Sequence, residues 1–91
     1  MNIERITSTA HPLYQQAREL YSISFPVHEQ RETRSQEQVL AQDAYHFDII
    51  CDKGNFIGEI LYWEVAGFFY IEHFCILPAM RNKHYGQKIL N

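Results

Sequence analysis

Hydrophobic positions near the start of the chain recur with the spacing of an α-helix. Four apolar residues follow an i, i+4, i+7, i+8 pattern, which places them on one side of a helix: Leu13, Ala17, Leu20 and Tyr21. The pattern predicts an amphipathic helix over residues 10–24, with Pro12 in its first turn, where a proline loses no hydrogen bond. Before it, residues 2–7 are predicted to form a short strand, with Ile3 and Ile6 as its apolar anchors.

A strongly polar segment, residues 28–38, follows this helix. Within it, Ser35 and Gln38 have the spacing of a capping box, in which two side chains satisfy free backbone N–H groups at a helix start. The sequence therefore predicts a second, short helix that begins there and carries Val39 and Leu40. The other charges of the segment are typical of a solvated helix surface.

From His46 onward, apolar residues alternate with polar ones, which indicates β-strands. The first of these strands is predicted to be half-buried, because Asp48 and Asp52 alternate with apolar neighbours. The aromatic residues of the later strands, Trp63 among them, are expected in the core. Two tight turns separate the strands, so the expected segments are strand 46–52, turn 52–55, strand 56–65, turn 66–67 and strand 68–77.

Pro78 closes the last predicted strand, and a basic stretch then leads into a helix start at residues 87–90. The predicted order is strand, helix, helix, three meandering strands and the start of a helix. This order is typical of an α+β fold with an antiparallel sheet.

The composition is that of one small folded domain. The 91 residues are 46% hydrophobic and 21% charged, with 4 Gly and 3 Pro, which excludes a disordered or collagen-like chain. A net charge of −3 disfavours general nucleic-acid binding, which depends on neutralising phosphates. Apolar runs are too short for a membrane span, and the N-terminus lacks the layout of a signal peptide. Two cysteines without an export signal favour reduced thiols in the cytoplasm.

The segment with the clearest chemical content joins a strand, a basic loop and a helix start. Free N–H groups at a helix start, together with the helix dipole, bind phosphate. Arg81 and Lys83 add positive charge beside that position, although the chain as a whole is acidic. The segment is therefore a candidate site for a phosphate-bearing ligand.

In this segment the chain resembles the GNAT family of N-acetyltransferases. The family signature has Arg or Gln, two residues, Gly, one residue, and Gly or Ala, and here Arg81, His84 and Gly86 stand at its positions. An Ile-Leu-Pro strand end at residues 76–78 and a Phe-Pro loop at residues 25–29 also match the family. The resemblance implies a GNAT-like sheet cut before its second half, so residues 1–91 are expected to form a single partial N-acetyltransferase domain.

The resemblance implies acetyl-CoA as co-substrate and no metal. Backbone groups of three strand residues would bind the pantetheine and the thioester carbonyl: Phe74, Cys75 and Ile76. The pyrophosphate would be bound by the following segment: Arg81, Asn82, Lys83, His84, Tyr85, Gly86 and Gln87. His84 replaces the first glycine of the signature, and its side chain is expected to crowd the pyrophosphate and weaken binding. The alternative is that a protonated His84 donates a charge-assisted bond to phosphate. The general acid for the departing thiolate would lie in the second half of the fold.

The acceptor implied by the resemblance is a primary amine, on a small molecule or a protein N-terminus. Glu72 is the candidate general base, and strand alternation places it on one face with Tyr70 and Phe74. The same alternation puts His73, a weaker candidate, on the other face with Ile71 and Cys75. The acceptor is expected to contact the loop after the first helix: Phe25, Pro26, Val27 and Glu29. For Glu72 and for Glu29, the alternative interpretation is a solvent-exposed charge without a catalytic or binding role.

The five histidines show no spacing typical of a zinc site. Cys75 is interpreted as a packed strand thiol rather than an acyl carrier.

The alternative function is a non-catalytic GNAT-like module that binds CoA weakly at most. Because residues 68–77 would form an apolar sheet edge, the chain is expected to self-associate, most simply as a two-fold dimer.

Overall fold

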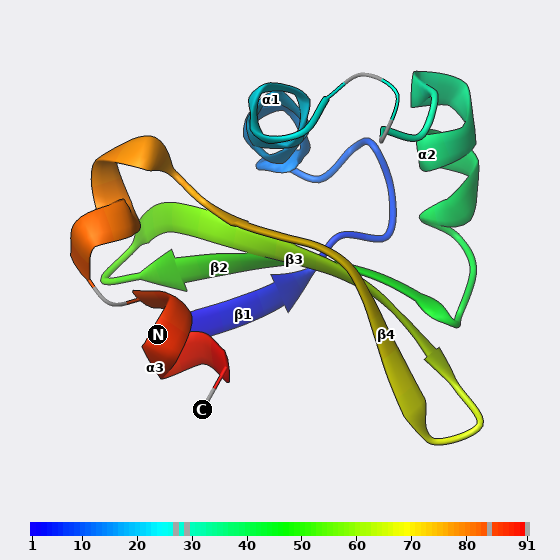
Figure 1. The fold of residues 1–91 in the computed structure, drawn as a ribbon. Coiled ribbons are helices and arrows are strands. Elements are labelled where there is room, and N and C mark those ends of the chain that lie inside the picture. The colour runs from blue at the N-terminus through cyan, green and yellow to red at the C-terminus, as the bar shows by residue number, and fades with distance from the viewer. Residues whose placement is uncertain (27, 29, 84, 91) are drawn as a thin grey trace.

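The computed structural model describes residues 1–26, 28, 30–83 and 85–90 as one α+β unit (Figure 1). A four-stranded antiparallel sheet has the order β1-β2-β3-β4, which is also the order along the chain. Helices α1 and α2 lie over one face, and α3 lies at the other (Figure 1). The elements are β1 (Asn2–Arg5), α1 (Tyr14–Ser24), α2 (Thr33–Val39), β2 (Tyr45–Asp52), β3 (Asn55–Val65), β4 (Phe68–Ile76), the 3₁₀ helix η2 (Pro78–Lys83) and α3 (Tyr85–Leu90). The predicted α+β class and antiparallel meander are confirmed.

Both tight turns of the meander use left-handed backbone. Lys53 and Gly54 have φ values of 53° and 83°, and Ala66 and Gly67 have 52° and 82°. Positive φ at both central residues matches the right-handed twist of the flanking strands, which is why such turns close two-residue hairpins. The predicted turns at residues 52–55 and 66–67 are confirmed.

The main core lies between α1 and the sheet. Ala17, Leu20 and Tyr21 are buried on the helix, as its periodicity predicts, and Phe47 and Leu61 are buried on the strands beneath. The prediction of a half-buried β2 is wrong. Asp48 is only 7% exposed, and it accepts a 3.0 Å hydrogen bond from the Tyr62 hydroxyl, so the second face of the sheet is also covered there.

Two further predictions about local structure are corrected at the N-terminal end. Helix α1 begins at Tyr14, because residues 8–13 form turns in which the Leu13 N–H donates to the His11 Nδ1 at 3.0 Å. Strand β1 ends at Arg5 rather than at residue 7, and Ile3 is 59% exposed whereas Ile6, just beyond the strand and bonded through its N–H to the Phe47 carbonyl, is buried; residues three apart in extended chain point to opposite faces.

The capping box does not form. Helix α2 begins at Thr33, which places Ser35 inside the helix, and the N-cap residue Glu32 makes no side-chain capping hydrogen bond. The buried polar residue of α2 is instead Gln36, whose Nε2 donates to the Tyr45 hydroxyl at 2.8 Å.

The β3–β4 hairpin extends beyond the helices (Figure 1). Four consecutive residues at the start of β4 are 56–69% exposed: Phe68, Phe69, Tyr70 and Ile71. The expectation that the aromatic residues here form core is therefore wrong for this half of β4, because no helix among the described residues covers it. Trp63 fits the expectation better, since it packs on the buried Tyr45 with a ring separation of 4.9 Å. No helix in the described ranges is long and apolar enough to cross a membrane.

Candidate active site

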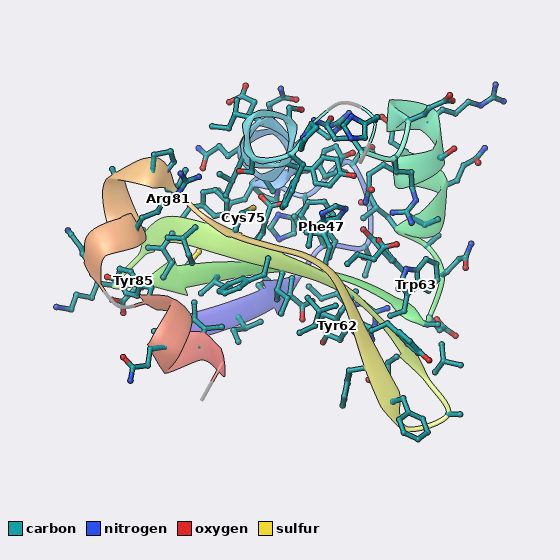
Figure 2. All side chains as sticks on the ribbon, viewed as in Figure 1. Phe47, Tyr62, Trp63, Cys75, Arg81 and Tyr85 are labelled. Carbon is teal, nitrogen blue, oxygen red and sulfur yellow. The ribbon has the colours of Figure 1, made fainter. Side chains whose placement is uncertain are left out.

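A pocket of about 320 Å³ lies where α1, β4 and η2 meet, and we call it the β4–η2 pocket. Its lining consists of Ser24, Phe25, Phe74, Cys75, Ile76 and Arg81. Figure 2 shows Cys75 and Arg81 at this end of the sheet. The structure thus brings together four residues predicted to contact CoA and one predicted to contact the acceptor.

The end of β4 and the start of η2 give this pocket its shape. The Leu77 N–H donates to the Ile57 carbonyl at 2.8 Å, which continues the pairing with β3 just beyond the strand end. The chain then turns into η2, and the Arg81 Nε donates back to the Ile76 carbonyl at 3.1 Å. This bond holds an exposed guanidinium beside the strand end, between the residues predicted to bind the thioester and those predicted to bind the pyrophosphate.

Cys75 is a buried thiol, 8% exposed. Burial, reinforced by the charge of Glu59, raises the pKa of Cys75 to about 12. A thiol of that acidity carries almost no thiolate at neutral pH, and the thiolate is the nucleophilic form. This supports the interpretation of Cys75 as a packing residue.

Glu59 is a buried acid that the sequence analysis did not single out. It pairs across the sheet with Ile49 on β2 and Cys75 on β4, and its side chain is 0% exposed. Neither carboxyl oxygen has a hydrogen-bond partner among the described residues, and burial raises the pKa of Glu59 to about 9. An available signal was its place on an apolar face of the strand, two residues before Leu61.

A second pocket of about 240 Å³, the α1–β4 pocket, contains the candidate base. It is lined by Tyr21, Gln30, Arg31, Glu72 and His73. In the pairing of β3 with β4, Leu61 faces His73 and Tyr62 faces Ile71, so Glu72 is an extra residue in a β-bulge. The predicted alternation is therefore wrong here: the bulge places Ile71 and His73 on opposite faces, and likewise Tyr70 and Phe74.

Phe25 connects the two pockets. It lines the β4–η2 pocket, and its ring lies 4.2 Å from that of His73, which lines the α1–β4 pocket. Tyr21 packs on both, with ring separations of 5.7 Å to Phe25 and 5.2 Å to His73. The pocket with the predicted cofactor residues and the pocket with Glu72 are therefore neighbours, and the contact between the rings of Phe25 and His73 lies between them.

Arg31 binds Glu72 and is absent from the residues that sequence reasoning predicted. Its Nη1 lies 3.2 Å from the Glu72 Oε1 and its Nη2 lies 3.0 Å from the Oε2. Burial acts to lower the pKa of Arg31, but the hydrogen bond and charge of Glu72 more than offset it, so this pKa is raised. Nothing in the local pattern distinguished Arg31 from the other charges of its segment.

The remaining predicted residues are more dispersed. Lys83 in η2 and Gln87 in α3 are exposed, as is Pro26. The Tyr85 hydroxyl donates to the Asp52 carboxylate at 2.9 Å, which ties α3 to the β2–β3 turn. Asn82 lies in η2 and Gly86 lies in α3, while Val27, Glu29 and His84 lie outside the described residues.

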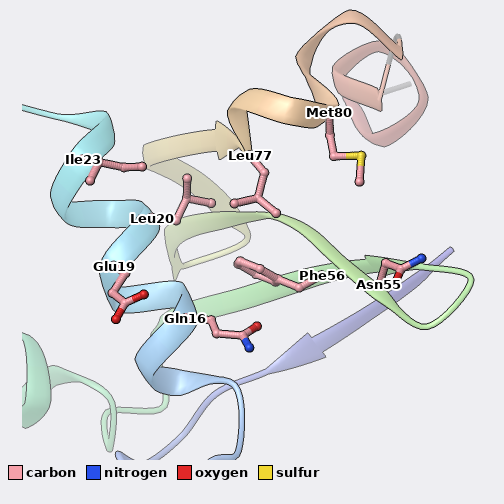
Figure 3. Close-up of a pocket in the computed structure, with 8 residues that line it drawn as sticks. All are labelled: Gln16, Glu19, Leu20, Ile23, Asn55, Phe56, Leu77 and Met80. Atoms are coloured by element: carbon pink, nitrogen blue, oxygen red, sulfur yellow. The ribbon is translucent and has the colours of Figure 1, made fainter.

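A larger pocket of about 650 Å³ opens between α1, the β2–β3 turn and η2 (Figure 3). Leu20, Phe56 and Leu77 form its apolar part, and Gln16 and Glu19 stand at its polar side. No predicted site residue is among its described lining residues. Across residues 1–26, 28, 30–83 and 85–90, no group of three His, Cys, Asp or Glu side chains could hold a metal ion.

Comparison with known proteins decides the family. Residues 10–91 match the family model for the acetyltransferase (GNAT) family. The chain belongs to the GNAT family. The GNAT fold is also that of a solved structure from Bacteroides thetaiotaomicron, provisionally described as a GNAT-family acetyltransferase, with a TM-score of 0.90 and 35% identity. The alignment covers 99% of this chain and 52% of that one, so the chain spans about half the length of the GNAT structure it matches. No curated protein matches it.

Proposed function

We propose that this GNAT chain is the N-terminal part, a single partial domain over residues 1–91, of an N-acetyltransferase that transfers acetyl from acetyl-CoA to a primary amine. One observation carries the proposal. The β4–η2 pocket joins the predicted cofactor strand and Arg81 to Phe25 of the predicted acceptor loop, and it adjoins the pocket that contains Glu72. The acceptor is a small molecule or a protein N-terminus, and the reducing cytoplasm suits the two free cysteines.

The residues of the β4–η2 pocket fit acetyl-CoA, which supplies an activated acetyl thioester when bound. Arg81 and Lys83 are exposed cations suited to the phosphates, together with the backbone of residues 82–87. Because β4 has no further strand beside it among the described residues, those backbone N–H groups of residues 74–76 that point away from β3 are available to the thioester carbonyl.

On the acceptor side, the proposed contacts come from the loop after α1, namely Phe25, Pro26, Val27 and Glu29. An amine attacks only in its neutral form, so a group must accept its proton. Glu72 is the proposed general base that takes this proton, because it lies in the adjoining pocket and its side chain is 30% exposed.

Removing the two cations beside the β4–η2 pocket tests the cofactor assignment. The double variant Arg81→Ala, Lys83→Ala should lower the affinity for CoA about tenfold or more, because charge-assisted bonds to phosphate contribute roughly 1.5–3 kcal/mol each. Calorimetric titration with CoA measures this. The matched control, Arg34→Ala with Lys53→Ala, removes two exposed cations elsewhere and should bind as the wild type does. Equal affinity in both double variants would contradict the assignment.

The alternative function, a non-catalytic module that self-associates, is favoured by the exposed start of β4. A two-fold pairing of β4 with β4 would satisfy its free backbone groups and cover Phe69 and Ile71, which are 64% and 56% exposed. Sedimentation at micromolar concentration should therefore show a dimer. Ile71→Lys should restore the monomer, because a charged edge opposes pairing. A monomeric wild-type chain would refute the dimer.

A further inference from the structure

The side chain of Arg31 links the connection between α1 and α2 to β4. Its guanidinium binds both oxygens of Glu72 at 3.2 and 3.0 Å, and its Nη1 also lies 3.2 Å from the Gln36 Oε1. Its centre lies 5.4 Å from the ring of Tyr45 and 6.0 Å from that of Trp63. The Arg31 side chain therefore contacts the sheet and α2, at the far end of the connection that contains the predicted acceptor loop.

The backbone of the same residue is also fixed. The Arg31 N–H donates to the Tyr21 hydroxyl at 2.8 Å, which joins it to α1. The neighbouring Gln30 Nε2 donates to the carbonyls of Phe25 at 2.6 Å and Ser22 at 3.0 Å. Both residues thus draw the connection against the end of α1, and the Arg31 side chain links it on to β4 by two hydrogen bonds to Glu72.

The partner of Arg31 stands at a special position in the strand. Glu72 is the extra residue of the β4 bulge, and a bulge redirects a side chain and leaves it without a fixed cross-strand neighbour. A bidentate guanidinium fixes the plane of a carboxylate, which a single lysine ammonium does not. Arg31 thereby supplies the orientation that the sheet does not provide at this residue.

We propose that Arg31 is the positioning residue of the acceptor side: by binding both oxygens of Glu72, it holds the α1–α2 connection on β4 and fixes where that carboxylate stands. The inference rests on the proposed acetyl-transfer function. A carboxylate offers about four lone-pair sites, and Arg31 uses two, so Glu72 keeps room for a bond from an amine without leaving Arg31. Arg31 itself exchanges no proton with the acceptor.

Hydrogen exchange of the wild-type chain and single variants tests the proposal. Arg31→Met should speed exchange at the amides of residues 30–36 about ten- to a hundredfold, because the loss of two charge-assisted bonds lets the connection open locally. Exchange at the buried amides of β2 and β3 should change much less. Glu72→Gln should reproduce the local effect, and the double variant should add little to either single one.

Two controls separate positioning from general support of the fold. Arg31→Lys keeps the positive charge but cannot bind both oxygens of Glu72 in one plane. It should therefore restore the protection of residues 30–36 from hydrogen exchange only in part. Arg34→Met removes an exposed arginine of α2 and should change nothing. Equal acceleration in β2 and residues 30–36, or none with Arg31→Met, would overturn the inference.

Acetyl-CoA binding, measured by calorimetry on the same variants, should stay within about twofold of wild type, because Arg31 does not line the β4–η2 pocket. A wild-type chain that binds no acetyl-CoA would refute the proposed function and leave the exchange result standing. A tenfold loss of affinity in Arg31→Met would contradict its confinement to the acceptor side.

Discussion

The stability of the wild-type protein will fall as the pH rises from about 5 to 9, and Glu59→Gln will remove most of this dependence. Glu59 has an ordinary pKa of 4.5, and burial raises its pKa in the fold to about 9. The folded state therefore holds a proton that the unfolded state has released across this range. The contribution of the protonated carboxyl is complete below pH 4.5 and is lost as the pH approaches 9.

The effect is large because the surroundings of Glu59 offer little compensation. Among the described charged groups only Arg18 of α1 acts to lower this pKa, and Cys75 of β4 is held as a neutral thiol. One pKa unit corresponds to about 1.4 kcal/mol, and allowing for local relaxation we expect a loss of roughly 1–3 kcal/mol between pH 5 and pH 8. The amide that Glu59→Gln introduces would stay neutral throughout, at a fixed cost for its unpaired polar groups.

Urea unfolding at several pH values measures this dependence, with Glu37→Gln as the control because Glu37 is exposed on α2. The wild type and the control should show the same downward slope, while Glu59→Gln should be nearly flat. A flat wild-type profile would mean that Glu59 is ionised in the fold at neutral pH and finds a partner there.

Gly58→Ala will separate β3 from the end of β4. A Cβ at this position would lie 2.5 Å from the Cys75 carbonyl oxygen and 2.8 Å from the Ile76 Cδ1. The first contact is with backbone, so the strands themselves must move. Forced overpacking of this kind costs about 1–3 kcal/mol and occasionally more, and we expect the upper part of that range.

The same displacement should reach the β4–η2 pocket, because Cys75 and Ile76 line it. Thermal unfolding and CoA titration of Gly58→Ala should therefore show a loss of stability together with a loss of affinity. Gly67→Ala is the control, since its Cβ would meet nothing within 4 Å and only its φ of +82° opposes the change. It should cost about 1 kcal/mol and leave CoA binding intact. Normal affinity in Gly58→Ala would show that the pocket does not depend on this strand pairing.

Local pattern predicted the elements well and their exact surroundings less well. The spacing from Leu13 to Tyr21 and the two glycine turns specify α1 and the meander, because helix periodicity and left-handed turns act over a few residues. Which side chains are covered depends on contacts between distant elements. The exposure of Phe69 and the burial of Asp48 both depend on where other elements end. The alternating pattern of one strand carries no information about those distant elements.

For the same reason, only part of the candidate site could be predicted from the sequence. The signature around Arg81 and the Phe25 loop could be identified in the sequence, and the structure places both at one pocket. The pairing of Arg31 with Glu72 joins residues 41 positions apart, so it depends on the fold. The bulge at Glu72 also escaped prediction, since one extra residue reverses every later face assignment while leaving the alternating pattern unchanged.

The meander has a consequence for the order in which the protein folds. Strands β2, β3 and β4 are joined by two-residue turns, so their contacts are local and their hairpins can close within about 1–10 μs. Strand β1 and helix α1 leave the ribosome before β2, yet β1 pairs only with β2 among the described residues. An isolated helix of 11 residues is marginal in water. During synthesis the N-terminal third is therefore expected to stay unfolded until β2 and β3 have paired and it can pack against them.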